Sequence, residues 1–249
     1  MKILSGLSHK NPPRWLENNF LFRRLFLLRK LYFTRSKFIH FGGAGEDISI
    51  RKIFPRGYHG VFVDVGCYHP IKYSNTWALY KKGWSGINID VDEIKIELFK
   101  KVRKRDINIA CAVSNKSEEV KYYRAGLFSQ INTLDEGHTG VMDNYITMTV
   151  ECKTLTSLID GTVYKDKKID LLCIDAEGHD FEVLESLDFN RYHPSLIAVE
   201  IHAHTFDGVQ ESELYRFLKN REYTLVGWCG ETILMASAEL KRTLESRNN

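Results

Sequence analysis

The stretch GVFVDVGCYHPIKYSNTWALYKKGWSGINID, residues 60–90, gives the clearest fold signal in the chain. It starts with an apolar run that ends on Asp64, turns at Gly66, and continues as a helical segment over 74–82. A second apolar run then ends on Asp90. This order of strand, tight turn, helix, strand and acid is typical of a nucleotide-binding βαβ unit.

The first turn limits which nucleotide such a unit can bind. A G-x-G-x-x-G fingerprint, which shapes the backbone for a pyrophosphate, is absent. This absence disfavours an NAD-dependent oxidoreductase. The acid at the end of the second strand suits a ribose instead, because a carboxylate can accept hydrogen bonds from two vicinal hydroxyls.

Strand and helix patterns alternate through the rest of the chain, which predicts an α/β fold with a doubly wound, mostly parallel sheet and right-handed crossovers. The last two strands form a hairpin that supplies an antiparallel strand at one edge. The further strands are expected over 107–113, 119–124, 145–152, 169–174, 196–201, 223–228 and 232–236, and the further helices over 92–105, 153–160, 179–187 and 211–219.

Ligands of such sheets bind beyond the carboxyl ends of the strands. Four predicted strands end in polar residues: Asp64, Asp90, the segment Asp175-Ala176-Glu177-Gly178, and the segment Glu200-Ile201-His202-Ala203-His204. Because these ends share one edge of the sheet, we expect the side chains to converge on one cleft. That convergence predicts an enzyme.

The acids after the 169–174 strand have two interpretations. Asp175 and Glu177 can share a cation, fix an ammonium group or act as acid and base. Alternatively the acids cap the following helix, which accounts for Asp180 but less well for Glu177. We therefore expect a functional role for Glu177.

Period two in the next strand places Glu200, His202 and His204 on one face. The set can ligate a metal, although the sequence offers no further firm ligand. A histidine beside a carboxylate can equally serve as a general base. The loop residues 129–133 are weaker candidates for substrate contact, since loops also vary freely.

Charge and cysteine content bound the protein class. Residues 1–40 hold nine Lys or Arg and one Glu, a net charge of +8, so the remaining 209 residues carry −5 of the total +3. The acidic core and the lack of an aromatic-basic pattern disfavour nucleic-acid partners. Five separated cysteines without a C-x-x-C pair indicate reduced thiols and a cytoplasmic protein.

The N-terminal region is expected to be an appendage. Residues 1–45 form a basic, amphipathic helical extension and a glycine-rich linker, and residues 46–249 form the main domain. The helix expected over 14–33 is too interrupted by charge to span a bilayer or to be a signal peptide. It either packs on the main domain or lies against an anionic membrane, at the inner face.

Taken in order, several segments resemble the FkbM family of S-adenosylmethionine-dependent methyltransferases. They run from about residue 60 to 205: FVDVG at 62–66, SNT at 74–76, KGWSGI at 82–87, Asp90, AVS at 112–114, IDAEG at 174–178 and VE at 199–200. The resemblance implies a Rossmann-like class I methyltransferase with a seven-stranded sheet. It also implies S-adenosylmethionine as cofactor and O-methylation of a sugar hydroxyl, often in a surface polysaccharide, or of a polyketide.

The resemblance also implies roles for single residues. Asp64, Val65 and Gly66 would border the methionine part of the cofactor and Asp90 the ribose. Ala112 and Val113 would lie against adenine, Asn75 would orient the amino acid tail, and Asp175 would border the cofactor. Tyr68, where further glycines are frequent, is a candidate to face the sulfonium.

O-methylation also requires a base for the acceptor hydroxyl. His202 and Glu177 are the candidates, with Glu200 orienting the histidine or binding a sugar hydroxyl. A divalent metal at Asp175 is an alternative whose other ligands the sequence does not identify. A non-catalytic module that docks a membrane-bound assembly through residues 14–33 is the competing function.

Overall fold

The computed structural model describes residues 19–22, 24–25, 40–116, 119–126, 129 and 132–247. The chain divides into two units, residues 1–39 and 40–249. Of the helix expected over 14–33, residues 20–22 and 24–25 are helical, and 14–18, 23 and 26–33 lie outside the described residues. Within the described part of the chain, no helix is long and apolar enough to cross a membrane.

The centre of the second unit is a seven-stranded sheet of order β3-β2-β1-β7-β8-β10-β9. Neighbouring strands from β3 to β8 are parallel, and β10 is antiparallel to both β8 and β9. This confirms the predicted mostly parallel sheet with a C-terminal hairpin. The antiparallel strand is second from the edge, because β10 inserts between β8 and β9. The strands are β1 (Val61–Val65), β2 (Ser85–Asp90), β3 (Ile107–Ala110), β7 (Leu171–Ile174), β8 (Leu196–Glu200), β9 (Thr224–Cys229) and β10 (Thr232–Ala236).

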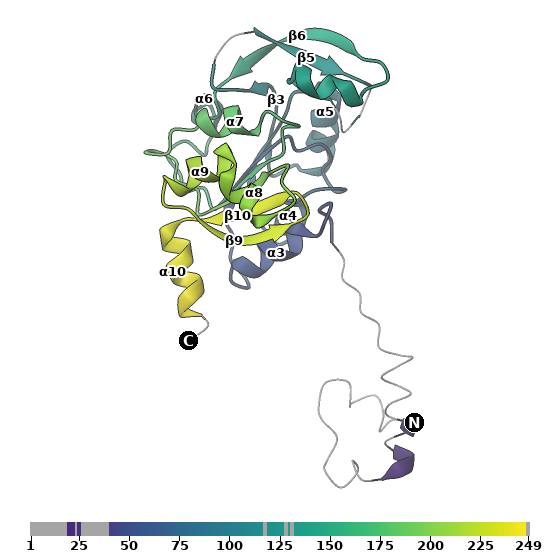
Figure 1. Cartoon of the computed structure of the whole chain (residues 1–249), viewed down its shortest axis with the longest axis vertical. Helices are drawn as coiled ribbons and strands as arrows, with labels where there is room; N and C mark the ends of the chain where they lie inside the picture. Colours follow the sequence, from purple (N-terminus) through teal and green to yellow (C-terminus); the bar gives the residue numbers. More distant parts are fainter. Residues whose placement is uncertain are drawn as a thin grey trace. The chain divides into compact units, whose positions relative to one another are not determined.

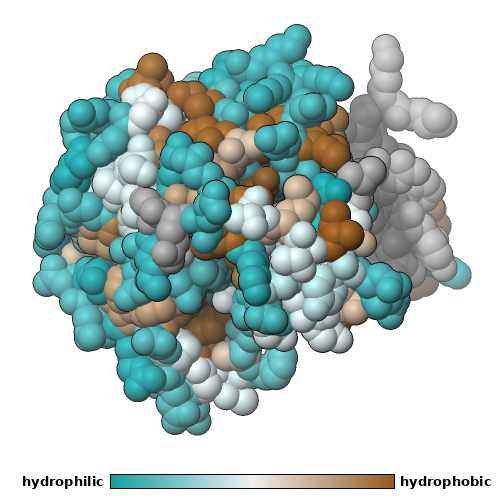
Figure 2. Space-filling view, turned by 90° about the horizontal axis from the view of Figure 1, so that it is seen from above, coloured by the Kyte–Doolittle hydropathy of each residue, from teal (hydrophilic) through white to brown (hydrophobic). Residues whose placement is uncertain are grey.

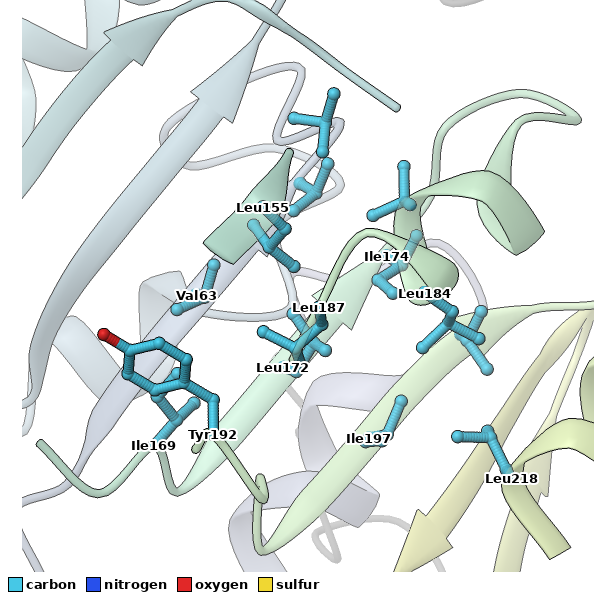
Figure 3. Packing of buried hydrophobic residues seen from close by; sticks show 14 of the residues in the cluster. Val63, Leu155, Ile169, Leu172, Ile174, Leu184, Leu187, Tyr192, Ile197 and Leu218 are labelled. Carbon is cyan, nitrogen blue, oxygen red and sulfur yellow. The ribbon is translucent and has the colours of Figure 1, made fainter. Parts of the chain in front are cut away.

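Helices cover both faces of this sheet, as Figure 1 shows. The buried apolar strands send alternate side chains to opposite faces: Phe62 belongs to one core cluster and Val63 to the other, and Leu171 and Leu172 divide in the same way. Figure 3 shows the larger cluster, in which strand residues pack against helices α6 (Leu155–Asp160), α7 (Asp180–Glu185), α8 (Phe206–Glu211) and α9 (Glu213–Lys219). The other face packs against α3 (Glu46–Ile53), α4 (Trp77–Tyr80) and α10 (Ala238–Ser246).

The chain between β3 and α6 leaves the main sheet. The single strand predicted over 107–113 is broken at Cys111, so that β4 (Ala112–Val113) joins a separate sheet of order β4-β6-β5. Its other strands are β5 (Glu119–Arg124) and β6 (Ile146–Lys153). Figure 1 shows this sheet at the end of the unit opposite α10. Hydrophobic atoms are exposed among hydrophilic ones at that end (Figure 2), where Ile146 and Met148 of β6 are exposed.

Two further elements frame the site. Helix α5 (Glu93–Val102) follows β2 and begins with Asp92 as its N-cap, whose side chain accepts a hydrogen bond from the Ile94 amide. The glycine-rich segment before α3 is tied to that helix, because Phe41 and Gly42 both donate their amides to Asp47 Oδ1 at 3.2 Å.

Candidate functional site

A pocket lies at the carboxyl ends of β1, β2 and β7. One more wall comes from β4 and another from the loop that contains Asn132 and Thr133. The pocket therefore occupies the position at which open α/β sheets bind ligands. Its lining includes the predicted residues Val65, Gly66, Asp90, Ala112, Val113, Asp175 and Glu177.

The remaining predicted residues lie outside this lining. Asp64 is buried beneath the pocket and accepts a 2.6 Å hydrogen bond from Thr76 Oγ1. Asn75 packs against Gly42, and its buried Oδ1 has no hydrogen-bond partner among the described residues. Glu200 and His202 lie together one strand further along the sheet, with Glu231.

Gly66 joins two strand ends. Its φ is 74°, in the left-handed region, and a Cβ at this position would lie 1.7 Å from the Asp175 carbonyl oxygen. Its amide donates to the Ile89 carbonyl at 2.9 Å. The glycine is thus required by the close approach of the chain after β1 to the chain after β7, a constraint of the fold itself rather than of a ligand.

Three non-glycine residues of the pocket lining also have positive φ: Tyr68 at 49°, Tyr73 at 58° and Glu177 at 51°. Such conformations cost about 1–3 kcal/mol each and persist where the surrounding structure enforces them. Their gathering around one pocket is typical of a functional site.

Asp90 is held by three donors. Its Oδ2 accepts from the Tyr68 amide at 3.2 Å and lies 3.5 Å from Lys95 Nζ, and its Oδ1 accepts from the Asp92 amide at 2.9 Å. Burial raises the pKa of Asp90, and the Lys95 charge opposes that shift. A carboxylate has about four acceptor positions. About one therefore remains for a ligand hydroxyl, fewer than the two that the sequence predicted.

Lys95 is a pocket residue that the sequence patterns do not predict. This side chain is buried, lines the pocket, and places Nζ 5.1 Å from the centre of the Tyr68 ring. A cation in the first turn of a helix opposes the helix dipole. Its position at the start of α5, shortly after a strand-terminal acid, was the signal available in the sequence.

A buried arginine supports the pocket from behind. Arg103, at the end of α5, is 0% exposed and donates Nε to Asp106 Oδ2 at 2.7 Å. Its other nitrogens donate to the Pro70 carbonyl at 3.3 Å and to Thr76 Oγ1 at 3.2 Å. Since Thr76 donates to Asp64, one guanidinium connects the end of β1, the loop after it and α5. No sequence pattern indicated this network.

Burial raises the pKa of Asp64 to about 6, and the Thr76 hydrogen bond and Arg103 charge reduce that shift. The unfolded carboxyl titrates near 3.8. The folded state therefore holds this proton more tightly. The resulting stabilisation is fully present below about pH 4 and is lost as the pH rises through about 6.

We expect Asp64→Asn to remove this pH dependence. Two pKa units correspond to roughly 3 kcal/mol. Between pH 4 and 7 the wild-type free energy of unfolding should fall by about that much more than the variant's, because an amide oxygen can accept the Thr76 bond without titrating. Urea unfolding at several pH values measures both slopes. Parallel slopes would contradict the assignment.

The segment after β7 brings several acids together. The Asp180 side chain holds the turn between β7 and α7, because it accepts hydrogen bonds from the Ala176 amide at 2.9 Å and the Gly178 amide at 3.3 Å. Desolvation of its carboxyl, then the neighbouring Glu200 charge, raises the pKa of Asp175 well above its usual value. The turn is fixed to the opposite loop, because Thr133 Oγ1 donates to the Glu177 carbonyl at 2.8 Å.

The alternation predicted for Glu200, His202 and His204 does not continue beyond β8. The strand ends at Glu200, and the next residues form a tight turn in which the Ala203 amide donates to the Ile201 carbonyl at 2.9 Å. Glu200 and His202 still lie close together, but His204 is not in their cluster. Its place is taken by Glu231 from the β9–β10 turn, a residue for which the sequence predicts no role in the site. Of the loop 129–133, Asn132 and Thr133 line the pocket, and Gln130 and Ile131 lie outside the described residues.

Solved structures that resemble this chain include three methyltransferases from different bacteria. The methyltransferase FkbM from Methylobacillus flagellatus matches at 12% identity and a TM-score of 0.48, over 72% of this chain and 43% of its own length. The TehB-like SAM-dependent methyltransferase from Corynebacterium glutamicum matches at 14% identity and a TM-score of 0.41, over 86% of this chain and 95% of its own length. The O-methyltransferase from Bacillus cereus, solved in complex with SAH, matches at 12% identity and a TM-score of 0.36, over 94% of both chains.

The sequence itself gives the family. No curated protein matches it significantly. The family model of the methyltransferase FkbM domain matches residues 64–225, from the acid inside β1 to the start of β9. This match covers well over half of the chain and includes every wall of the pocket. The chain therefore belongs to the FkbM methyltransferase family.

Proposed function

We propose that the protein transfers a methyl group from S-adenosylmethionine to a hydroxyl oxygen of a sugar, in a surface glycan or a related molecule. Membership of the FkbM family supports the reaction class. The acceptor class follows from the resemblance noted in the sequence. The observation that supports the cofactor is the pocket itself, in which Asp90 stands on one wall and Asp175 and Glu177 stand on another.

The lining suits a nucleoside that bears a cation. Ala112 and Val113 offer an apolar surface for a base, and Asp90 retains an acceptor position for a ribose hydroxyl. Carboxyl groups on the opposite wall can balance that positive charge, because a nearby cation favours the ionised form of a carboxyl such as Asp175, whose pKa is raised in its absence. When bound, the cofactor supplies an electrophilic methyl group on a sulfonium.

The chain's own residues then perform two tasks. Lys95 and the Tyr68 amide fix the orientation of Asp90, so that the ribose contact is preorganised. Glu177 is our candidate for the group that accepts the acceptor's proton, because it is the predicted base that lines the pocket. His202 and Glu200 stand beside this wall rather than in it.

Calorimetry and methyl transfer together test the proposal. We expect the full chain to bind S-adenosylhomocysteine, and Asp90→Asn to weaken that binding at least tenfold by removing charge from a buried acceptor. Glu177→Gln should keep the affinity within a few-fold while lowering transfer of labelled methyl to free and nucleotide-activated hexoses by about 10²–10⁴. Glu245→Gln, on α10 at the opposite end, is the matched control.

Three outcomes would contradict parts of the proposal. Failure of the full chain to bind S-adenosylhomocysteine would refute the cofactor assignment. Binding unaffected by Asp90→Asn would place the cofactor elsewhere. Transfer that survives Glu177→Gln would remove this carboxylate from the role of base.

A further inference from the structure

A cluster of Glu200, His202 and Glu231 lies next to the pocket. One ligand atom from each side chain lies within 4.8 Å of the other two. Glu200 ends β8, His202 lies in the turn that follows, and Glu231 lies in the turn between β9 and β10. The three residues thus come from sequence positions that meet only in the folded sheet.

The backbone fixes this meeting. Thr232 pairs with Glu200 in the antiparallel register of β10 and β8. The Ile201 amide donates to the Glu231 carbonyl at 2.6 Å, which fastens the two turns to each other. Glu200 is on a strand, and this bond joins the two turns that carry His202 and Glu231, so the ligands are held more firmly than they would be on loose loops. His202 and Glu231 are exposed, so an ion can reach them from the solvent.

Glu200 has one unsatisfied carboxylate oxygen in this position, although the side chain neighbours Asp175. Its Oε2 is buried without a hydrogen-bond partner among the described residues. Over the same part of the chain, the ion pairs of Lys and Arg involve neither Glu200 nor Glu231. A buried carboxylate oxygen without a donor is costly unless a proton or a cation binds it.

The ligand types indicate which cation. Mg²⁺ and Ca²⁺ prefer sites made of oxygen alone, whereas an imidazole with carboxylates suits Mn²⁺ or Zn²⁺. Ligand atoms of a tetrahedral site with bonds of about 2.1 Å lie roughly 3.4 Å apart. The cluster needs only a modest contraction to reach that spacing. Three protein ligands also leave coordination positions open.

We propose that Glu200, His202 and Glu231 form a binding site for a divalent transition metal ion, Mn²⁺ or Zn²⁺. The site is one strand removed from Asp175, where the sequence placed a metal as an alternative. Its open positions would hold an oxygen of the acceptor beside Glu177. That role, unlike metal binding itself, rests on the proposed methyltransferase function. A metal ion at this site makes His202 a metal ligand rather than the general base that the sequence suggested.

Metal titration of the tag-free, chelator-treated full chain tests the site. Mn²⁺ is the first probe, because this ion binds thiols weakly and the chain has five cysteines, and its binding is measured by electron paramagnetic resonance. Zn²⁺ binding is then measured by calorimetry. We expect one equivalent to bind. His202→Ala and Glu231→Gln should each weaken binding at least tenfold. His204→Ala is the matched control, because this histidine is two residues away and outside the cluster, and it should bind as the wild type does.

The results separate this proposal from the function proposed above. No Mn²⁺ or Zn²⁺ binding by the wild type, or equal binding by the wild type and both cluster variants, would overturn the metal site. S-adenosylhomocysteine is titrated into the same chelator-treated samples. Cofactor binding without metal binding overturns the metal site alone, and metal binding without cofactor binding supports the site while overturning the methyltransferase function. Circular dichroism confirms that each variant is folded.

Discussion

Gly66→Ala is expected to lower the free energy of unfolding by roughly 3–5 kcal/mol, among the largest effects of a single substitution. An alanine at φ 74° costs about 1–2 kcal/mol by itself. The larger part comes from the methyl group, which would lie 1.7 Å from the Asp175 carbonyl oxygen. That oxygen can retreat only if the chain after β7 moves away from β1. Urea unfolding followed by circular dichroism measures the change.

Gly57→Ala is the matched control for this substitution. Gly57 has nearly the same φ, 79°, but a Cβ there meets nothing within 4 Å. Its alanine variant therefore incurs the backbone cost of about 1–2 kcal/mol and no collision. The difference between the two variants isolates the contact between the strand ends. Equal losses for Gly66 and Gly57 would show that this contact does not constrain the fold.

Arg103→Met is expected to destabilise the protein by roughly 3–5 kcal/mol, because it leaves the buried carboxylate of Asp106 without its cation. The variant also removes the donors to Pro70 and Thr76. The double variant Arg103→Met with Asp106→Asn should recover part of the loss, since the orphaned charge disappears. The free energies of unfolding of the four proteins complete a double-mutant cycle.

Arg191→Met is the control for burial. Arg191 also pairs with carboxylates, Asp160 and Asp166, each at 2.8 Å, but its side chain is 37% exposed. Water screens such a pair and solvates the partners that remain after substitution. We therefore expect a much smaller change than for Arg103. If the two methionine variants were equally unstable, burial would not explain the effect.

Local patterns were sufficient to predict the main sheet. The alternation of apolar runs with helical segments gave the strand types, and the hairpin around Gly230 gave the antiparallel strand. Two details depended on long-range pairing. The run 107–113 reads as one strand, yet it divides at Cys111 because β4 pairs with β6. The helix expected over 74–82 shortens to α4, since Ser74 and Thr76 instead bond to Trp77 and Asp64.

Strand ends gave most of the site, because carboxyl ends of parallel strands meet at one edge. Side chains that reach it from elsewhere were missed. Lys95 enters from a helix, where only its short distance in sequence from Asp90 is a signal, and Glu231 enters from a hairpin turn that no periodicity places near Glu200. Gly66 was predicted to matter, but the reason required the structure: its neighbour is the Asp175 carbonyl, more than a hundred residues later.

The buried guanidinium of Arg103 has a consequence for local opening of the chain. If the loop after β1 detaches, the hydrogen bond from Arg103 to the Pro70 carbonyl breaks. The Arg103 charge, which is 0% exposed in the folded protein, is then either exposed to water or left buried without this acceptor. Segments opened at such a cost exchange their amide hydrogens with the slow, global class. The Ser74 amide, bonded to the Phe41 carbonyl at 3.0 Å, reports on this loop. Its exchange should be as slow as that of β1, so the loop behaves as part of the cooperative core and not as a hinged cover.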